Sequence, residues 1–377
     1  MSKVKLGEVA KEHKETCRDN KDGYPVVGLE HLVPEEVTLT AWDEGCDNTF
    51  TKMFRKGNVL FGRRRAYLKK AAVAPFDGIC SGDITVIEAI QDRILPELLP
   101  FIIQNDDLFD FAVGKSAGSL SPRVKWEHLK NYEFELPDMD KQRELAELLW
   151  AINATKKSYQ KLIAATDELV KSQFIEMFGD VHENPYEWDI IKLGDACEIL
   201  NGFAFKSKLY VDEGIRIIRI TNVQKGYIDD SDPQFYPLSY KNELPKYMLF
   251  NGDILLSLTG NVGRVGLLPQ EMLPAALNQR VACIRMKHGS PVSKMFLYSM
   301  MNSDFFEADC IASSQGIAQK NMSTEWLKEY PIIVPPQSMQ DFYSAFVRQS
   351  DKSKFELEQA LSELTATYKR IIKENLG

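Results

Sequence analysis

The chain has 377 residues and a net charge of −8, with 44% hydrophobic and 27% charged residues. This composition is typical of a folded protein of two or three domains, and it excludes a disordered or collagenous chain. No apolar run reaches the roughly 18–20 residues of a membrane helix, and the N-terminus lacks the apolar core of a signal peptide. The six cysteines form no CxxC pair, so we expect reduced thiols and a cytoplasmic location.

Residues 1–138 are predicted to form a mixed domain of short strands and helices, with a helical segment near 96–112. The window from Thr49 to Phe76 contains eight Lys or Arg residues and no acidic residue. The negative total charge argues against a nucleic-acid partner, but phosphates respond to the local field. This window therefore keeps nucleic acid open as a partner.

Residues 139–178 are predicted to form one long helix, because they contain neither Pro nor Gly. Apolar residues from Leu145 to Val170 follow the steps of three and four of a heptad seam, which Lys156 interrupts. Such a helix is roughly 57 Å long, more than an ordinary globular helix needs. Gly179 and Pro185 mark residues 179–188 as a linker.

The remaining chain repeats this plan. Residues 189–336 are predicted to form a second mixed domain, with strands near 215–220, 252–258 and 281–286 and a helical segment near 294–310. Residues 337–377 are predicted to form a second long helix, whose seam includes Leu357, Leu361, Leu364 and Tyr368.

The two halves align directly. Residues 98–179 match 296–377 without a gap at an offset of 198, and the identities extend into the loops before each long helix. Two related helices can pair antiparallel about a pseudo-two-fold axis, so we expect them to form a coiled coil. The alternative is that each helix packs only on its own domain.

Several segments, duplicated in order, carry a family resemblance. They are KLGD (192–195), NGFAF (201–205), NGDILLSLTGNVGRVG (251–266), SSQGIAQKNMS (313–323), IIVPPQSMQ (332–340) and LVKSQFIEMFGD (169–180). Together they resemble the DNA specificity (S) subunit of type I restriction-modification systems. In the first half, FGRRRAYLKK (61–70) and SAGSLSPRVKW (116–126) depart from the corresponding segments of the second. We expect these departures where the choice of DNA sequence is encoded.

The resemblance implies a mixed α/β (α+β) fold. Two pseudo-symmetric target-recognition domains, each a mixed sheet with helices, would be joined by two long antiparallel helices. Each domain would read half of a split double-stranded DNA target. Such subunits have no catalytic centre and no cofactor of their own. They dock two methyltransferase (M) subunits, which carry S-adenosylmethionine, and in some systems two ATP-driven nuclease (R) subunits. ATP and Mg²⁺ belong to those partners, and no membrane is involved.

The expected DNA contacts are basic, amide and hydroxyl side chains, because phosphates need cations and base edges need paired donors and acceptors. In the first domain they are Arg63, Arg64, Arg65, Tyr67, Lys69, Lys70, Lys115, Ser116, Ser119, Arg123 and Lys125. In the second they are Asn201, Lys206, Lys208, Thr259, Asn261, Arg264, Asn278, Gln279, Arg280, Ser314, Gln315, Gln319, Lys320 and Asn321. Phe203, between two of these segments, suits the core as well as it suits a contact.

Catalytic and metal-binding motifs fail on inspection. Asn184-Pro185-Tyr186 lacks the second proline of an adenine-methyltransferase motif, and no FxGxG companion exists. The five histidines include no pair at metal-ligand spacing. No catalytic or metal-ligating residue is therefore predicted. Two other classes stay open: a stand-alone DNA-modifying enzyme with duplicated binding domains, and a coiled-coil adaptor that binds only proteins.

Overall fold

The computed structural model describes residues 2–17, 21, 23–44, 48–180, 182–314 and 321–377. The chain forms two compact units, one of residues 1–162 with 357–377 and one of residues 163–356. Each unit has a hydrophobic core of its own. Among the described residues, no helix is both long and apolar enough to cross a membrane.

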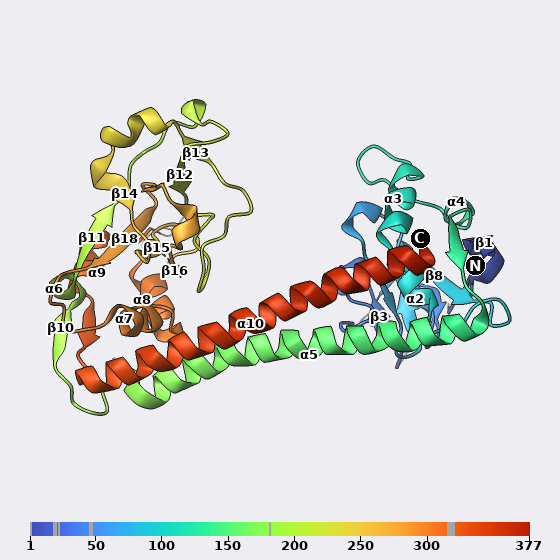
Figure 1. Cartoon of the computed structure of the whole chain (residues 1–377), viewed down its shortest axis with the longest axis horizontal. Coiled ribbons are helices and arrows are strands. Elements are labelled where there is room, and N and C mark those ends of the chain that lie inside the picture. Colours follow the sequence, from blue (N-terminus) through green and yellow to red (C-terminus); the bar gives the residue numbers. More distant parts are fainter. Residues whose placement is uncertain (1, 18–20, 22, 45–47, 181, 315–320) are drawn as a thin grey trace. The chain divides into compact units, whose positions relative to one another are not determined.

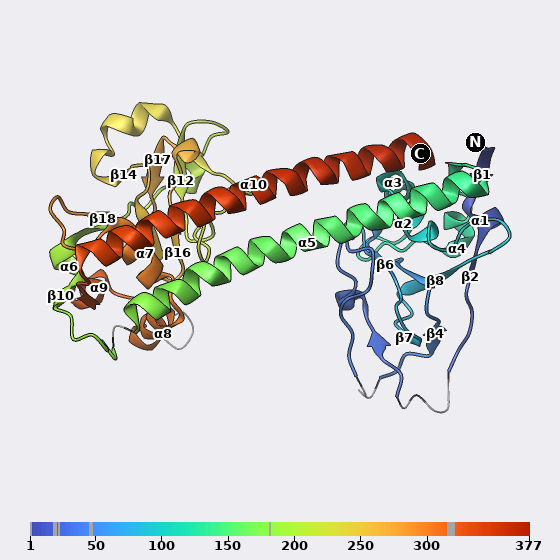
Figure 2. The same ribbon diagram turned by 60° about the horizontal axis from the view of Figure 1, so that its bottom comes forward.

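Unit 1 contains a two-stranded, a three-stranded and a four-stranded sheet, in the orders β1-β9, β3-β7-β4 and β2-β8-β5-β6 (Figure 2). In the three-stranded sheet β3 is parallel to β7, and the pairs of the other two sheets are antiparallel. The strands are β1 Ser2–Lys5, β2 Ala10–Glu12, β3 Val26–Val27, β4 Lys52–Phe54, β5 Val59–Gly62, β6 Ala71–Val73, β7 Gly78–Cys80, β8 Ile84–Ala89 and β9 Glu133–Leu136.

Unit 2 repeats this topology with one additional strand, β13, and its sheets have the orders β10-β19, β13-β12-β17-β14 and β11-β18-β15-β16 (Figure 1). Here β12 is parallel to β17, as β3 is to β7 in unit 1. The strands are β10 Ile190–Lys192, β11 Cys197–Asn201, β12 Ile215–Ile218, β13 Phe235–Tyr236, β14 Met248–Leu249, β15 Ile254–Ser257, β16 Val265–Leu267, β17 Ala275–Leu277, β18 Val281–Met286 and β19 Pro331–Ile333.

The short helices also recur in the same order. They are α1 Leu6–Val9, α2 Leu99–Ile103, α3 Asp106–Gly114 and α4 Trp126–Leu129 in unit 1, and α6 Leu193–Ala196, α7 Lys294–Met301, α8 Asp304–Ser313 and α9 Thr324–Glu329 in unit 2. The single helical segment expected in each half is in fact two helices. Asn105 and Ser303, which are equivalent residues, accept a backbone N–H and cap the second helix of each pair.

The two long helices lie within the ranges predicted for them. They are α5 Met139–Phe178 and α10 Gln337–Leu376, and both contribute to both compact units. In unit 1 the ammonium of Lys156 on α5 lies 4.9 Å from the ring centre of Tyr368 on α10. In unit 2 Lys354 on α10 forms an ion pair with Asp167 on α5 at 2.7 Å. The start of each helix therefore packs with the end of the other, and the antiparallel coiled coil is confirmed.

A buried glutamine attaches the first turn of each long helix to its own unit. In unit 1 Gln142 accepts the backbone N–H of Leu95 and donates to the carbonyl of Pro137. In unit 2 Gln340 accepts the N–H of Ser293 and donates to the carbonyl of Pro335. Both side chains are buried, so these bonds are shielded from competing water.

Candidate nucleic-acid interface

Three segments of unit 1 that are far apart in the sequence meet at one end of the four-stranded sheet. Arg63, just after β5, donates its N–H to the carbonyl of Asp83, just before β8, at 3.0 Å. Its own carbonyl accepts the N–H of Val124 at 3.0 Å, and Arg64 forms an isolated bridge with Arg123. The backbone therefore places the arginine run beside the loop that precedes α4.

The arginines at this edge differ in their surroundings. Arg64 donates from Nη2 to the hydroxyl of Ser121 at 3.1 Å and lies 3.5 Å from a carboxylate oxygen of Asp83. Arg123 donates to both carboxylate oxygens of Asp83, at 2.7 and 3.2 Å. Arg65 is exposed and has a left-handed backbone with φ of 54°, which is uncommon for residues other than glycine.

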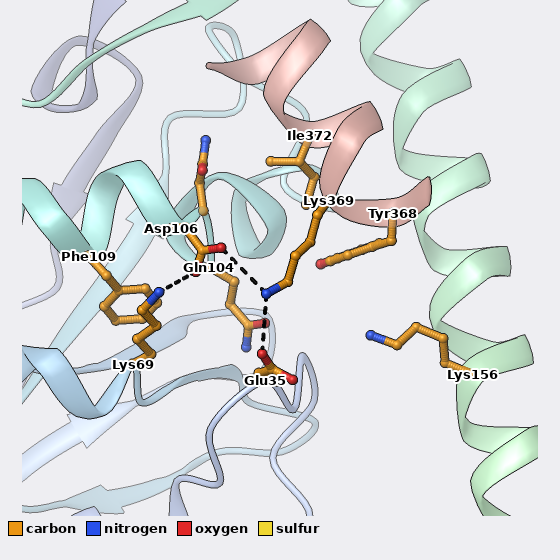
Figure 3. Close-up of a pocket in the computed structure, with 10 residues that line it drawn as sticks. Glu35, Lys69, Gln104, Asp106, Phe109, Lys156, Tyr368, Lys369 and Ile372 are labelled. Carbon is orange, nitrogen blue, oxygen red and sulfur yellow. Dashed lines mark hydrogen bonds and ion pairs between the residues drawn. The ribbon is translucent and has the colours of Figure 1, made fainter. Parts of the chain in front are cut away.

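The two lysines at the end of this segment are used inside the unit. Lys69 donates to Asp106 at 2.5 Å, which raises the pKa of Lys69 through a hydrogen bond to the carboxylate. Figure 3 shows Asp106 between Lys69 and Lys369 of α10, whose ammonium also reaches Glu35. Lys70 donates to the carbonyl of Leu29 at 2.8 Å. Both lysines therefore contribute bonds within unit 1, whereas the side chain of Tyr67 is 54% exposed.

The loop before α4 presents a mixture of free and bound side chains. Lys115, Ser119 and Lys125 are exposed. The ammonium of Lys115 lies 5.8 Å from the ring centre of Phe111. Ser116 donates its hydroxyl to the carbonyl of Ala112 at 2.8 Å, so it caps the end of α3.

The window from Thr49 to Phe76 contains no acidic residue, but acidic residues from other segments lie beside it in the structure. Arg55 binds Glu15 and Asp77, which come from outside the window. Lys52 donates to the carbonyl of Ile84 at 2.6 Å, and burial lowers its pKa. The positive charge predicted from this window is therefore partly neutralised by carboxylates elsewhere in the unit.

Unit 2 builds the same edge from different residues. Leu258 donates its N–H to the carbonyl of Arg280 at 3.0 Å, and its carbonyl accepts the N–H of Met322 at 2.9 Å. Thr259 forms an isolated bridge with Asn321. These bonds match those of unit 1 one for one. They make Arg64, Asp83 and Arg123 equivalent to Thr259, Arg280 and Asn321.

The loop that follows β15 is closed by a buried hydroxyl. Ser257 donates to the carbonyl of Asn261 and accepts the backbone N–H of Arg264 at 3.1 Å. The guanidinium of Arg264 donates to Gln224 at 2.5 Å, while Asn261 is exposed. The hydroxyl oxygen of Thr259 is buried and has no hydrogen-bond partner among the described residues.

Other predicted contacts of unit 2 lie next to this loop. Gln279 and Arg280 are exposed, and Gln279 donates its N–H to the carbonyl of Phe203 at 3.1 Å. Asn278 is half-buried and accepts the N–H of Arg280 at 3.3 Å. Phe203 itself packs against Phe205 and Tyr247 in a satellite apolar cluster. It therefore belongs to the packing of the unit.

The remaining predicted contacts of unit 2 are exposed, are bonded within the unit, or lie outside the described residues. Asn201 donates to the hydroxyl of Thr324 at 3.3 Å, and Lys206, Lys208 and Asn321 are exposed. Ser314 donates its hydroxyl to the carbonyl of Ile311 at 2.7 Å, at the end of α8. Gln315, Gln319 and Lys320 lie outside the described residues.

Sequence reasoning missed Asp83, which lies at the centre of the edge in unit 1. The carboxylate is held by Arg123 and Arg64, and these bonds lower its pKa. The signal was available, because Asp83 directly precedes β8 just as Arg280 precedes β18. The residue type favours Arg280 as a DNA contact and disfavours Asp83, because an acid near phosphates is unexpected.

Two copies of one α+β domain, each with a long helix, define a duplicated recognition architecture. The sequence matches the family described as Type I restriction modification DNA specificity domain over residues 1–165 and again over 185–365. The chain belongs to this family and carries its domain twice.

Individual relatives agree with this assignment. The chain is 24% identical over 327 residues to the type I restriction enzyme MjaVIII specificity subunit of Methanocaldococcus jannaschii, covering 82% of this chain and 71% of the relative. It is 30% identical over 167 residues to the EcoAI specificity subunit of Escherichia coli, covering 42% of this chain and 28% of the relative.

Solved structures share the fold. A chain from a type I restriction-modification system, studied for its assembly and conformational transition, superposes with a TM-score of 0.60 at 20% identity. The match covers 99% of this chain and 97% of that one. The S subunit from M. genitalium gives a TM-score of 0.58 at 14% identity, covering 100% and 96%.

Proposed function

We propose that this chain is the non-catalytic specificity subunit of a DNA adenine methyltransferase complex, and that it reads a bipartite duplex target with one half-site per unit. The observation that carries the proposal is the repeated sheet edge. In both units the loop after β5 or β15, the second strand in chain order of the sheet β2-β8-β5-β6 or β11-β18-β15-β16, meets the residue before β8 or β18 and the loop before α4 or α9. Arginine and lysine side chains gather there in unit 1, and arginine and amide side chains gather there in unit 2.

The chemistry of this edge suits duplex DNA. Exposed cations such as Arg65 and Lys125 would neutralise phosphates, which supply affinity without sequence information. Guanidinium and amide groups such as those of Arg280 and Asn321 present the paired donors and acceptors that base edges in the major groove require. The different residues at equivalent positions would give the two half-sites different sequences.

The helix pair would set the gap between the half-sites. Each helix has 40 residues, equivalent to roughly 60 Å at 1.5 Å per residue. A seven-residue insertion near Ala154 in α5, matched by one opposite it in α10, should lengthen the gap and leave both half-site sequences unchanged. Altered half-site letters with an unaltered gap would contradict this part of the proposal.

The exposed face of the helix pair is proposed to dock the methyltransferase (M) subunits. Leu148 and Leu169 on α5 are three heptads apart and lie on the same helix face, and each is about half exposed. Isolated exposed leucines are ordinary, but regularly spaced ones suit a partner. In this arrangement S-adenosylmethionine belongs to the M subunits, and ATP and Mg²⁺ belong to nuclease (R) subunits where these are present. L148K and L169K should abolish co-purification with the M subunit, whereas Q160K, on another face, should not.

The decisive test is co-expression with an adenine methyltransferase subunit in a host free of methylation, followed by mapping of modified adenines. We expect a split motif with two short specific halves and a fixed gap. The triple variant R63A/R64A/R65A should lose methylation by at least tenfold through lost phosphate and base contacts. The matched triple K3A/K11A/K14A removes three exposed charges elsewhere in unit 1 and should keep the motif. Full methylation by the arginine variant would contradict the proposed interface.

A further inference from the structure

Asp83 holds two arginines of unit 1 in fixed positions. Arg123 donates from Nε to one carboxylate oxygen at 2.7 Å and from Nη2 to the other at 3.2 Å. Nη1 of Arg64 lies 3.5 Å from the second oxygen. The Asp83 side chain is only 20% exposed, whereas the two arginine side chains are 38% and 40% exposed. The acid therefore lies beneath guanidinium groups that reach solvent.

The backbone fixes all three residues relative to one another. The carbonyl of Asp83 accepts the N–H of Arg63, and the carbonyl of Arg63 accepts the N–H of Val124. Ser121 accepts a second bond from Arg64 at 3.1 Å. The carboxylate is ionised at neutral pH, since the bonds from Arg123 hold its pKa below the ordinary value of 3.8. The cluster keeps one net positive charge.

The bond pattern leaves a particular edge of Arg123 available. A guanidinium carries five N–H donors in a planar fork. Asp83 occupies the side edge, formed by Nε and one hydrogen of Nη2. No other residue that the structure describes bonds the end edge, formed by Nη1 and the other hydrogen of Nη2. Two parallel donors match the O6 and N7 acceptors of guanine in the major groove.

We propose that Arg123, oriented by Asp83, reads a guanine in the half-site of unit 1, and that Asp83 is the positioning residue for this contact. The inference rests on the proposed DNA-recognition function and deepens it. A guanidinium held by a carboxylate loses less side-chain freedom on binding, so a wrong base is discriminated more sharply.

Unit 2 offers a comparison within the same chain. The residues equivalent to Arg64, Asp83 and Arg123 are Thr259, Arg280 and Asn321. An arginine therefore stands where unit 1 has the aspartate. Arg280 is exposed and contacts no carboxylate within the described part of the chain. Substitution of Asp83 should therefore affect one half-site only.

The competing explanation is an ion pair that merely stabilises unit 1, as many partly exposed ion pairs do weakly. The variant D83A, in complex with the M subunit, separates the two. A positioning role predicts that one base of the unit 1 half-site loses discrimination by about tenfold while the unit 2 half-site is unchanged. Affinity for unrelated DNA should rise, because a negative charge near phosphates has been removed.

Two further variants control the experiment. R123K keeps the charge and an ion pair with Asp83 but loses the fork, so it should relax the same base position even where D83A folds poorly. D77A removes an acid that holds Arg55 in the same unit, and it should leave every letter of the motif intact.

The outcomes are distinct. If D83A and R123K lower methylation equally at all sites without changing any letter, Asp83 is only structural and the inference is wrong. If instead the wild-type complex gives no split motif, the proposed function itself fails, whatever these variants do.

Discussion

The two recognition units are alike where they hold the long helices and different where their sheets end. Gln142 and Gln340 occupy equivalent positions and make the same bonds to a neighbouring loop and to the proline segment before the helix. At the sheet edge, by contrast, the Arg–Asp–Arg cluster of unit 1 corresponds to Thr259, Arg280 and Asn321. The attachment of the helices is therefore the same in both units, whereas the sheet edge proposed to bind DNA differs between them.

The difference also appears in how each edge is held. In unit 1 the ionised carboxylate of Asp83 holds the guanidinium groups of Arg64 and Arg123 in place. In unit 2 the hydroxyl of Ser257 organises the backbone of the following loop, and the equivalent residue of unit 1 is Gly62. One scaffold therefore supports two ways of ordering a polar surface, one through side chains and one through the backbone.

The largest effect is expected at the helix attachment. Q340L leaves the N–H of Ser293 and the carbonyls of Pro291 and Pro335 unpaired in a buried site. We expect a loss of roughly 3 kcal/mol in the free energy of unfolding, because each unpaired buried group costs about 1–3 kcal/mol. Urea denaturation followed by circular dichroism measures it, and Q337L on the exposed side is the control.

The same substitution in unit 1 checks whether the attachments are independent. Q142L should lower amide hydrogen-exchange protection in residues 1–162, whereas Q340L should lower it in residues 163–356. Equal loss of protection in both units from either variant would show that the attachments are coupled.

A second prediction concerns Arg280, which no carboxylate of the described residues holds in place. R280A should relax one base of the unit 2 half-site by about tenfold. It should change the free energy of unfolding by less than about 0.5 kcal/mol, because the side chain is exposed. Methylation mapping and denaturation on the same preparation test both statements. A strongly destabilised R280A would mean that Arg280 belongs to the scaffold.

A third prediction addresses the loop held by Ser257. S257A removes the bonds to Asn261 and Arg264, so it should cost roughly 1–2 kcal/mol of stability. It should also increase hydrogen exchange in residues 258–264 while exchange in residues 63–70 stays constant. S231A, an exposed serine of the same unit, is the matched control. Unchanged exchange in the loop would indicate that its glycines alone fix its shape.

The smallest effect is expected at Lys156, the residue that interrupts the heptad seam. Burial lowers its pKa from the ordinary value of 10.5, so the unfolded chain binds this proton more tightly than the folded one. Stability then rises with pH between the folded and the unfolded pKa. The free energy of unfolding of the wild type should therefore increase relative to K156M as the pH approaches 10.5. An unchanged difference would mean that the ammonium is fully hydrated.

Much of this fold was predictable from the sequence. Heptad spacing and the absence of Pro and Gly predicted both long helices to within a residue, because these signals act over many residues together. The break between α2 and α3 was not predicted. It depends on one capping side chain, Asn105, whose signal is weak beside the apolar pattern around it.

The candidate site was less predictable. The sequence identified the arginine run and the amide segments, but it did not reveal which basic residues are used internally. Lys69 and Arg55 bind carboxylates that lie 37 and 22 residues away in the sequence, and Arg123 binds Asp83 from 40 residues away. Such pairings are set by tertiary packing, which a local count of charges does not reflect.

The division of the chain between the two units has a consequence for biosynthesis. The core of unit 1 contains Tyr368, Ile372 and Leu376 from the last turns of α10, and Asn105 donates to the carbonyl of Leu376 at 3.3 Å. The unit that is translated first is therefore completed last. Unit 2, a single stretch of residues 163–356, has all its chain before that. Until then the nascent unit 1 lacks the residues of α10 that complete its core, so we expect this half of the protein to be the more prone to aggregation during synthesis.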